Sequence, residues 1–115
     1  MTSHVYTGRR DGLGAHVCKD GQPLLAERSL RARRHSPDGF NWGYGGSGPA
    51  QLALALLLEE TGADEAQRRY QSFKFGVIAG LQRESWTLDS AAIQDWLAQD
   101  RAARPLPETE ESCAE

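Results

Sequence analysis

The chain has 115 residues and a mass of 12.6 kDa, the size of one small domain. Its hydrophobic fraction of 39% and charged fraction of 25% are typical of a globular protein and argue against a disordered one. The lack of any apolar run near the roughly 20 residues that cross a bilayer argues against a membrane span. Residues 1–4 also lack the zones of a signal peptide.

Charge is unevenly distributed along the chain. Residues 1–57 carry seven Lys and Arg against four Asp and Glu, whereas residues 58–115 carry six against twelve. An acidic overall balance argues against polyanion binding as the main task. The two cysteines, Cys18 and Cys113, are too few and too far apart for a disulfide framework. We therefore expect a protein of the reducing cytoplasm.

The first predicted elements are short strands between tight turns. Residues 5–7 and 15–19 have strand character, and Asp-Gly pairs at 11–12 and 20–21 are typical of hairpin turns, because glycine adopts positive φ at no steric cost. Residues 23–25 follow the second turn. The pattern predicts an N-terminal antiparallel sheet of two or three strands.

Residues 35–49, HSPDGFNWGYGGSGP, combine glycines with three aromatic residues and therefore differ from a flexible Gly/Ser spacer. The aromatic side chains are expected to anchor this loop while the glycines allow close backbone approach. We predict that Trp42 and at least one of Phe40 and Tyr44 are largely buried against the following helix and the sheet.

Three helices are predicted after this loop. Residues 50–61 are apolar on all sides, so the first helix should be central and buried, with Ser47 or Gly48 as its N-cap and Gly62 at its end. A second helix begins near Asp64. Residues 86–88 suit a short extended segment, after which Asp89 caps the third helix. The fold class is α+β, with one domain over residues 1–104 and a disordered acidic tail over 105–115.

Residues 35–57, HSPDGFNWGYGGSGPAQLALALL, resemble the signature of a small bacterial and phage family of unknown function. The flanking segments YTGR at 6–9, GQPL at 21–24, YQSFK at 70–74 and WTL at 86–88 fit the same resemblance, which covers residues 5–97. The family carries over no activity, cofactor or catalytic residue. The resemblance implies an accessory protein of bacterial chromosomes, plasmids and phages.

The glycine-rich loop has two interpretations. A loop that enters a helix can hold an anion or a peptide terminus on free N–H groups, although Pro49 removes one of these donors. A nucleoside triphosphate site is disfavoured, because the lysine and the spacing of a P-loop are absent. The alternative is a rigid brace that holds the central helix against the sheet.

The basic segment at 28–35 also has two interpretations. Its arginines could contact nucleic-acid phosphates while the neighbouring aromatic residues stack on bases, and Arg68 and Arg69 could extend that patch. Alternatively, the segment is a solvated edge that pairs with acidic residues, and Arg68 and Arg69 face water. We expect the acidic pairs at 59–60 and 64–65 to be solvated.

Enzymatic and metal-binding interpretations have weaker support. His16 and Cys18 share one strand face, and His4 could approach them, but no standard ligand spacing is present. Ser36 and His35 are neighbours in sequence without a third, orienting group. We expect no catalytic residue, no metal and no cofactor.

The sequence therefore predicts a non-enzymatic cytoplasmic binding module with a protein partner, in the role of a host-defence-modulating accessory protein of a phage or mobile element. The alternative is nucleic-acid binding through residues 28–35 and the aromatic loop. No membrane contact is expected, and the oligomeric state stays open. The predicted partner-binding residues are Arg31, Arg33, Arg34, His35, Tyr44 and Ser47.

Overall fold

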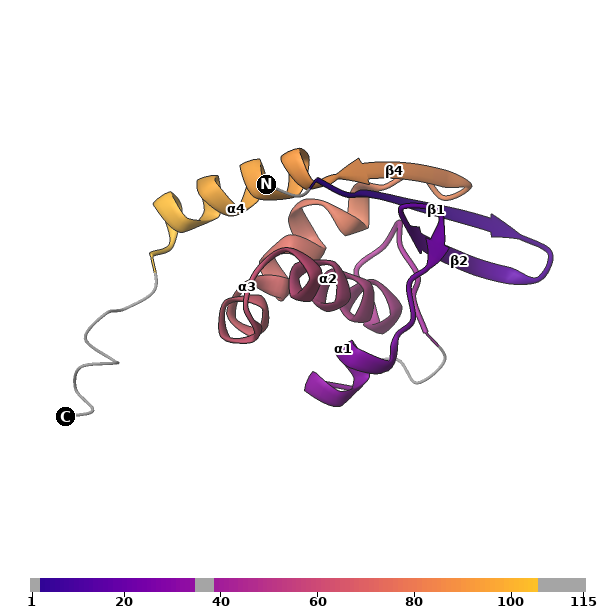
Figure 1. The fold of residues 1–115 in the computed structure, drawn as a ribbon, viewed down its shortest axis with the longest axis horizontal. Coiled ribbons are helices and arrows are strands. Elements are labelled where there is room, and N and C mark those ends of the chain that lie inside the picture. The colour runs from indigo at the N-terminus through magenta and orange to yellow at the C-terminus, as the bar shows by residue number, and fades with distance from the viewer. Residues whose placement is uncertain (1–2, 35–38, 106–115) are drawn as a thin grey trace.

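The computed structural model describes residues 3–34 and 39–105, and it confirms the predicted α+β class (Figure 1). The elements in chain order are strands β1 (Val5–Asp11), β2 (Gly14–Lys19) and β3 (Gln22–Pro23), helices α1 (Glu27–Ala32), α2 (Ser47–Glu60) and α3 (Ala63–Gly76), the 3-10 turn η1 (Ile78–Gly80), strand β4 (Ser85–Asp89) and helix α4 (Ser90–Ala103). The predicted tail, apart from Pro105, lies outside the described residues.

The sheet has four antiparallel strands in the order β3-β2-β1-β4. The first three form the predicted N-terminal sheet, and the segment predicted to be extended at 86–88 becomes β4, the opposite edge. Asp20 and Gly21, with φ of 52° and 82°, make the turn between β2 and β3. Two successive positive φ values are the geometry that an Asp-Gly pair favours, so this predicted turn is confirmed.

One face of the sheet is buried against the helices (Figure 1). Gly8 pairs with Val17 on one side and with Trp86 on the other, so their side-chain positions share the inner face. Gly8 is required there, because a Cβ atom at this position would overlap the Trp86 indole. The close approach of β1 and the indole thus depends on a residue without a side chain.

Helix α2 is the central helix, as predicted. Its residues 48–58 are all buried, including the polar Gln51. The Gln51 amide donates to Ser29 Oγ at 3.0 Å and to the Arg33 carbonyl at 2.9 Å, which satisfies the buried group and attaches α1 to α2. Helix α1 is a fourth helix that sequence analysis missed, because six arginine-rich residues show no apolar stripe.

The predicted ends of α2 were wrong by one or two residues. The N-cap is Gly46, and Ser47 is already helical, with no side-chain cap. The Tyr44 ring lies so close to Gly46 that a Cβ there would come within 2.5 Å of it, which explains a glycine at this cap. The C-cap is Thr61, and Gly62 instead caps the start of α3.

Trp42 anchors the glycine-rich loop, as predicted. Its side chain is fully buried and packs edge-on against Trp86, with 5.6 Å between the ring centroids, and its indole N–H donates to the Arg83 carbonyl at 3.0 Å. Phe40 is half-buried against the same core, whereas Tyr44 is 42% exposed. The loop is therefore a brace on its Trp42 side and an open surface on its Tyr44 side.

The acidic residues at the helix ends are not all solvated, contrary to the sequence-based expectation. Arg69 is buried and donates to Glu65 within α3 and to Asp100 of α4, at 2.8 Å and 2.9 Å. Arg101 also pairs with Glu65, at 2.6 Å. These contacts, led by the hydrogen bond from Arg101, lower the pKa of Glu65 to about 2. Arg69 consequently joins α3 to α4 and does not extend the basic segment.

Asp89 caps α4 by accepting a hydrogen bond from the Ala92 amide at 2.8 Å, as predicted. Ile93 and Leu97 form its buried face, and Trp96 packs at the margin against Phe73. Within residues 3–34 and 39–105, every helix is too short or too polar to cross a lipid bilayer.

Candidate functional site

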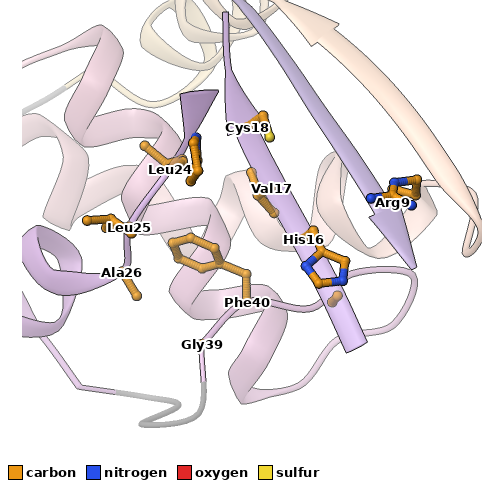
Figure 2. Close-up of a pocket in the computed structure, with 11 residues that line it drawn as sticks. Arg9, His16, Val17, Cys18, Leu24, Leu25, Ala26, Gly39 and Phe40 are labelled. Carbon is orange, nitrogen blue, oxygen red and sulfur yellow. The ribbon is translucent and has the colours of Figure 1, made fainter. Parts of the chain in front are cut away.

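A groove of about 430 Å³ runs beside β2, at the edge of the sheet (Figure 2). One wall is the strand itself, and the other is formed by the segment that follows β3 and by the residues that lead into the aromatic loop. The lining residues are Arg9, Ala15, His16, Val17, Cys18, Pro23, Leu24, Leu25, Ala26, Gly39 and Phe40.

The groove follows an unpaired stretch of β2. Strand β3 pairs only with Cys18 and Lys19, so it ends beside the last residues of β2. The Leu24 amide donates to the Val17 carbonyl at 2.8 Å, which shows that the Val17 backbone points away from β1. Because backbone direction alternates along a strand, the N–H and C=O of Ala15 also point away from β1. In the described part of the chain, no strand pairs with Ala15 on that edge.

The wall opposite β2 is apolar. Figure 2 shows the Phe40 ring between β2 and the segment that carries Leu25 and Ala26. Leu24 is half-buried, whereas Leu25 is 68% exposed although it lines the groove. An exposed leucine beside a half-buried phenylalanine gives the groove an apolar surface that a ligand side chain can cover.

Charged side chains lie at the outer face of β1 and β2, beside the groove. Asp11 holds His16 Nε2 at 3.0 Å and Arg9 Nη1 at 3.2 Å, and it also accepts from the Leu13 amide. The Leu13 amide first and His16 second lower the pKa of Asp11, so the carboxylate stays charged at neutral pH. Asp11 thereby holds Arg9 and His16 at the outer face of the sheet, beside the groove.

The structure distributes the predicted partner-binding residues over two places. Arg31, Arg33 and Arg34 are exposed on and just after α1, and Arg28 pairs with Glu59 at 3.6 Å. Tyr44 and Ser47 are exposed at the start of α2, and the Arg33 carbonyl accepts a hydrogen bond from the Gln51 side chain of the same helix at 2.9 Å. None of these residues lines the groove. His35 lies outside the described residues.

Sequence analysis missed the groove. The pattern around Leu24 and Leu25 predicts only the end of the strand region, and Ala15 and Val17 have the pattern of ordinary strand residues. The available signal was the short β3: a proline at residue 23 cannot donate a ladder hydrogen bond, which favours early termination of that strand.

The possible metal ligands do not come together. His4 Nδ1 contacts Asp20 at 2.6 Å, while His16 contacts Asp11. Among the residues that the structure describes, no group of three His, Cys, Asp or Glu side chains is arranged to hold a metal ion. The neighbouring Ser36 and His35 lie outside these residues.

A second hollow of about 560 Å³ lies between α2 and the start of α4. Glu60 is its central carboxylate and accepts from the Tyr6 hydroxyl at 2.5 Å and from Ser90 at 2.7 Å, while Gln94 donates to its other oxygen at 3.1 Å. Burial and the hydrogen bond to Glu60 raise the pKa of the Tyr6 hydroxyl well above its usual value. Both oxygens of this carboxylate already accept hydrogen bonds that join α2 to β1 and α4. We therefore interpret this cluster as structural.

The arrangement described so far is that of a small α+β protein with an open sheet edge beside an apolar groove. Residues 6–99 match a family of unknown function (DUF6166), and the chain belongs to this family. The match spans the sheet and the helices, in agreement with the extent of the predicted resemblance. No curated protein and no solved structure matches the chain.

Proposed function

We propose that this protein is a non-enzymatic binding module that holds an extended segment of a partner protein along β2. The observation that carries the proposal is the unpaired edge at Ala15 beside the apolar groove. An extended peptide can add to such an edge through main-chain hydrogen bonds, while side-chain pockets select its sequence.

The groove and the strand edge have complementary roles in this proposal. The Ala15 N–H and C=O would exchange hydrogen bonds with one residue of the peptide. A neighbouring apolar side chain would enter the groove between β2 and Leu25 and cover the Phe40 ring. The main chain then supplies the register, and the apolar contact supplies affinity and selectivity.

The opposite edge of the sheet lies outside this groove. Strand β4 is also an edge strand, and its Thr87 backbone points away from β1 by the same alternation, because the Glu84 carbonyl and the Ser90 amide both bond to the β1 segment. The groove beside β2 does not include any β4 residue. Thr87 therefore provides a matched control position.

The cellular role in the proposal follows the resemblance of residues 35–57. We place the module in the cytoplasm of a bacterium, as an accessory protein of a phage or mobile element that binds a host protein and modulates host defence. The nucleic-acid alternative through residues 28–35 has less support, because Arg28 pairs with Glu59 and Phe40 lines the groove.

A selection of linear peptides displayed on phage tests the proposal. The purified full chain should enrich peptides with apolar side chains at alternate positions. Fluorescence anisotropy then measures the dissociation constant of one selected peptide that carries a fluorescent label. Leu25→Asp should weaken this peptide about tenfold or more, since burying one leucine contributes about 1.5–3 kcal/mol. Leu13→Asp, at a leucine that is 90% exposed outside the groove, is the control and should leave binding unchanged.

A pair of proline variants tests the strand edge. Ala15→Pro removes the outward N–H without removing a β1–β2 hydrogen bond, and it should abolish peptide binding. Thr87→Pro makes the same change at the β4 edge and should not affect binding. Equal behaviour of the two proline variants, or equal affinity of the two aspartate variants, would contradict the proposed site.

A further inference from the structure

The exposed side of the glycine-rich loop forms a second surface, separate from the groove. Tyr44 is 42% exposed and Phe75, at the end of α3, is 66% exposed. The Phe75 ring lies against Gly45, where a Cβ would come within 3.1 Å of it, and the Tyr44 ring lies against Gly46. Two consecutive glycines thus allow two exposed rings to lie close to the backbone on one surface, which we call the aromatic platform.

Basic side chains from three segments of the chain lie around this loop. Lys74 of α3 holds its ammonium 4.1 Å from the Phe75 ring centroid, and the Arg83 side chain contacts Gly43. Arg10 of β1 lies over the Trp42 ring, at 4.9 Å, and donates to the Asn41 side chain and to the Trp42 carbonyl, at 3.3 Å. Arg10 and Arg83 therefore lie against residues 42 and 43 of the loop, and Lys74 lies against a ring of the platform.

The described basic side chains fall into two groups, and Arg10, Lys74 and Arg83 share with Arg31, Arg33 and Arg34 the group without a described carboxylate partner. In the part of the chain that the structure describes, Lys19, Arg28, Arg69, Arg101 and Arg104 each have a carboxylate partner. No described carboxylate forms an ion pair with Arg10, Lys74 or Arg83, whose contacts are with rings, carbonyl groups and an amide. Lys74 is buried, whereas Arg83 is exposed and Arg10 is half-buried, so two accessible positive charges beside two exposed rings favour a ligand that is both anionic and planar.

We propose that the aromatic platform binds single-stranded nucleic acid, with bases stacked on Tyr44 and Phe75 and phosphates facing Arg83 and Arg10. Aromatic rings beside positive charge are the combination that single-strand binding proteins use, because every base has a face that can stack. The site uses the aromatic loop but not the segment 28–35, and it is independent of the peptide groove.

Anisotropy with labelled oligo-dT and oligo-rU at low salt tests this inference. Both strands should bind, with an affinity that falls as salt rises. Tyr44→Ala and Phe75→Ala should each weaken binding about five- to hundredfold. Tyr44→Phe keeps a ring and should restore affinity. Because both rings are exposed, thermal melting of these variants should stay close to that of the parent chain, which separates loss of binding from loss of fold.

Matched charge variants complete the test. Arg83→Gln should weaken binding and reduce its salt dependence, whereas Arg28→Gln, at a cation already paired with Glu59, should change neither. Leu25→Asp alters the groove and should leave oligonucleotide affinity intact, so this inference and the proposed peptide function can fail separately. Absence of oligonucleotide binding at low salt, equal binding by the Tyr44→Ala and parent proteins, or preferential binding of poly-glutamate would overturn the inference.

Discussion

The interface of α3 with α4 and the surroundings of the glycine-rich loop use charge in opposite ways. Between the helices, Arg69, Glu65 and Asp100 form a nearly buried network in which each charge has an opposite partner. Around the loop, Arg10 donates to the neutral Trp42 carbonyl, and the buried Trp42 ring supplies the packing. Charge that joins the two helices is paired and enclosed, whereas Arg10 and Arg83 beside the loop have no described carboxylate partner.

The largest expected effect tests whether the loop depends on its aromatic anchor. Trp42→Ala removes a fully buried ring and its hydrogen bond to the Arg83 carbonyl, and it should lower the free energy of unfolding by about 3–5 kcal/mol. Arg83→Gln, which keeps that carbonyl, should change it by less than about 0.5 kcal/mol. Urea denaturation measures both. A large loss in Arg83→Gln would show that the loop charges are structural after all.

The helix interface should respond to loss of its central charge. Arg69→Ala leaves Asp100 with one exposed partner, Arg104, and should cost about 3 kcal/mol, the lower end of the range for a broken buried pair. Arg104→Ala removes only the exposed partner and should cost about 0–1 kcal/mol. Thermal melting distinguishes the two variants. Similar melting temperatures for both variants would contradict the expectation that the buried ion pair contributes more to stability than the exposed one.

Acid should weaken the helix interface before it affects the loop. The folded pKa of Glu65, about 2, lies below its ordinary value of 4.5, so its contribution is fully present above pH 4.5 and is lost as pH falls from there toward 2. Glu65→Gln should therefore flatten the decline of stability over this range, as measured by denaturation at a series of pH values. Arg83→Gln should follow the parent curve, because no carboxylate among residues 3–34 and 39–105 pairs with Arg83. An unchanged slope in Glu65→Gln would contradict the assignment.

Local patterning predicted the elements that depend on short-range signals. The Asp20-Gly21 turn, the apolar helix after Pro49 and the Asp89 cap each follow from a few neighbouring residues, and all three are present. Burial of Trp42 was predictable for a related reason, because the adjacent helix is apolar on all sides and offers it a core.

Features that depend on contacts between distant segments could not be predicted. Arg69 has the same helical environment in sequence as Arg68, and only the approach of α4 places Asp100 beside it. The groove likewise requires residues 15–18 and 23–26 to meet Phe40, which no periodicity specifies. The platform depends on α3 ending beside Gly45, so Phe75 gave no sign of its position.

The position of β1 in the sheet has a consequence for synthesis of the chain. Val5 and Thr7 pair with Asp89 and Thr87, so the first strand is interior to the sheet but receives its second neighbour only after β4 has been synthesised. At about 5–20 residues per second, the ribosome takes roughly 4–17 s to make the intervening residues. During that interval the nascent chain carries a strand with one open edge and the apolar Tyr6 face beside it. The newborn protein is accordingly most vulnerable to aggregation, and most in need of a chaperone, before β4 emerges.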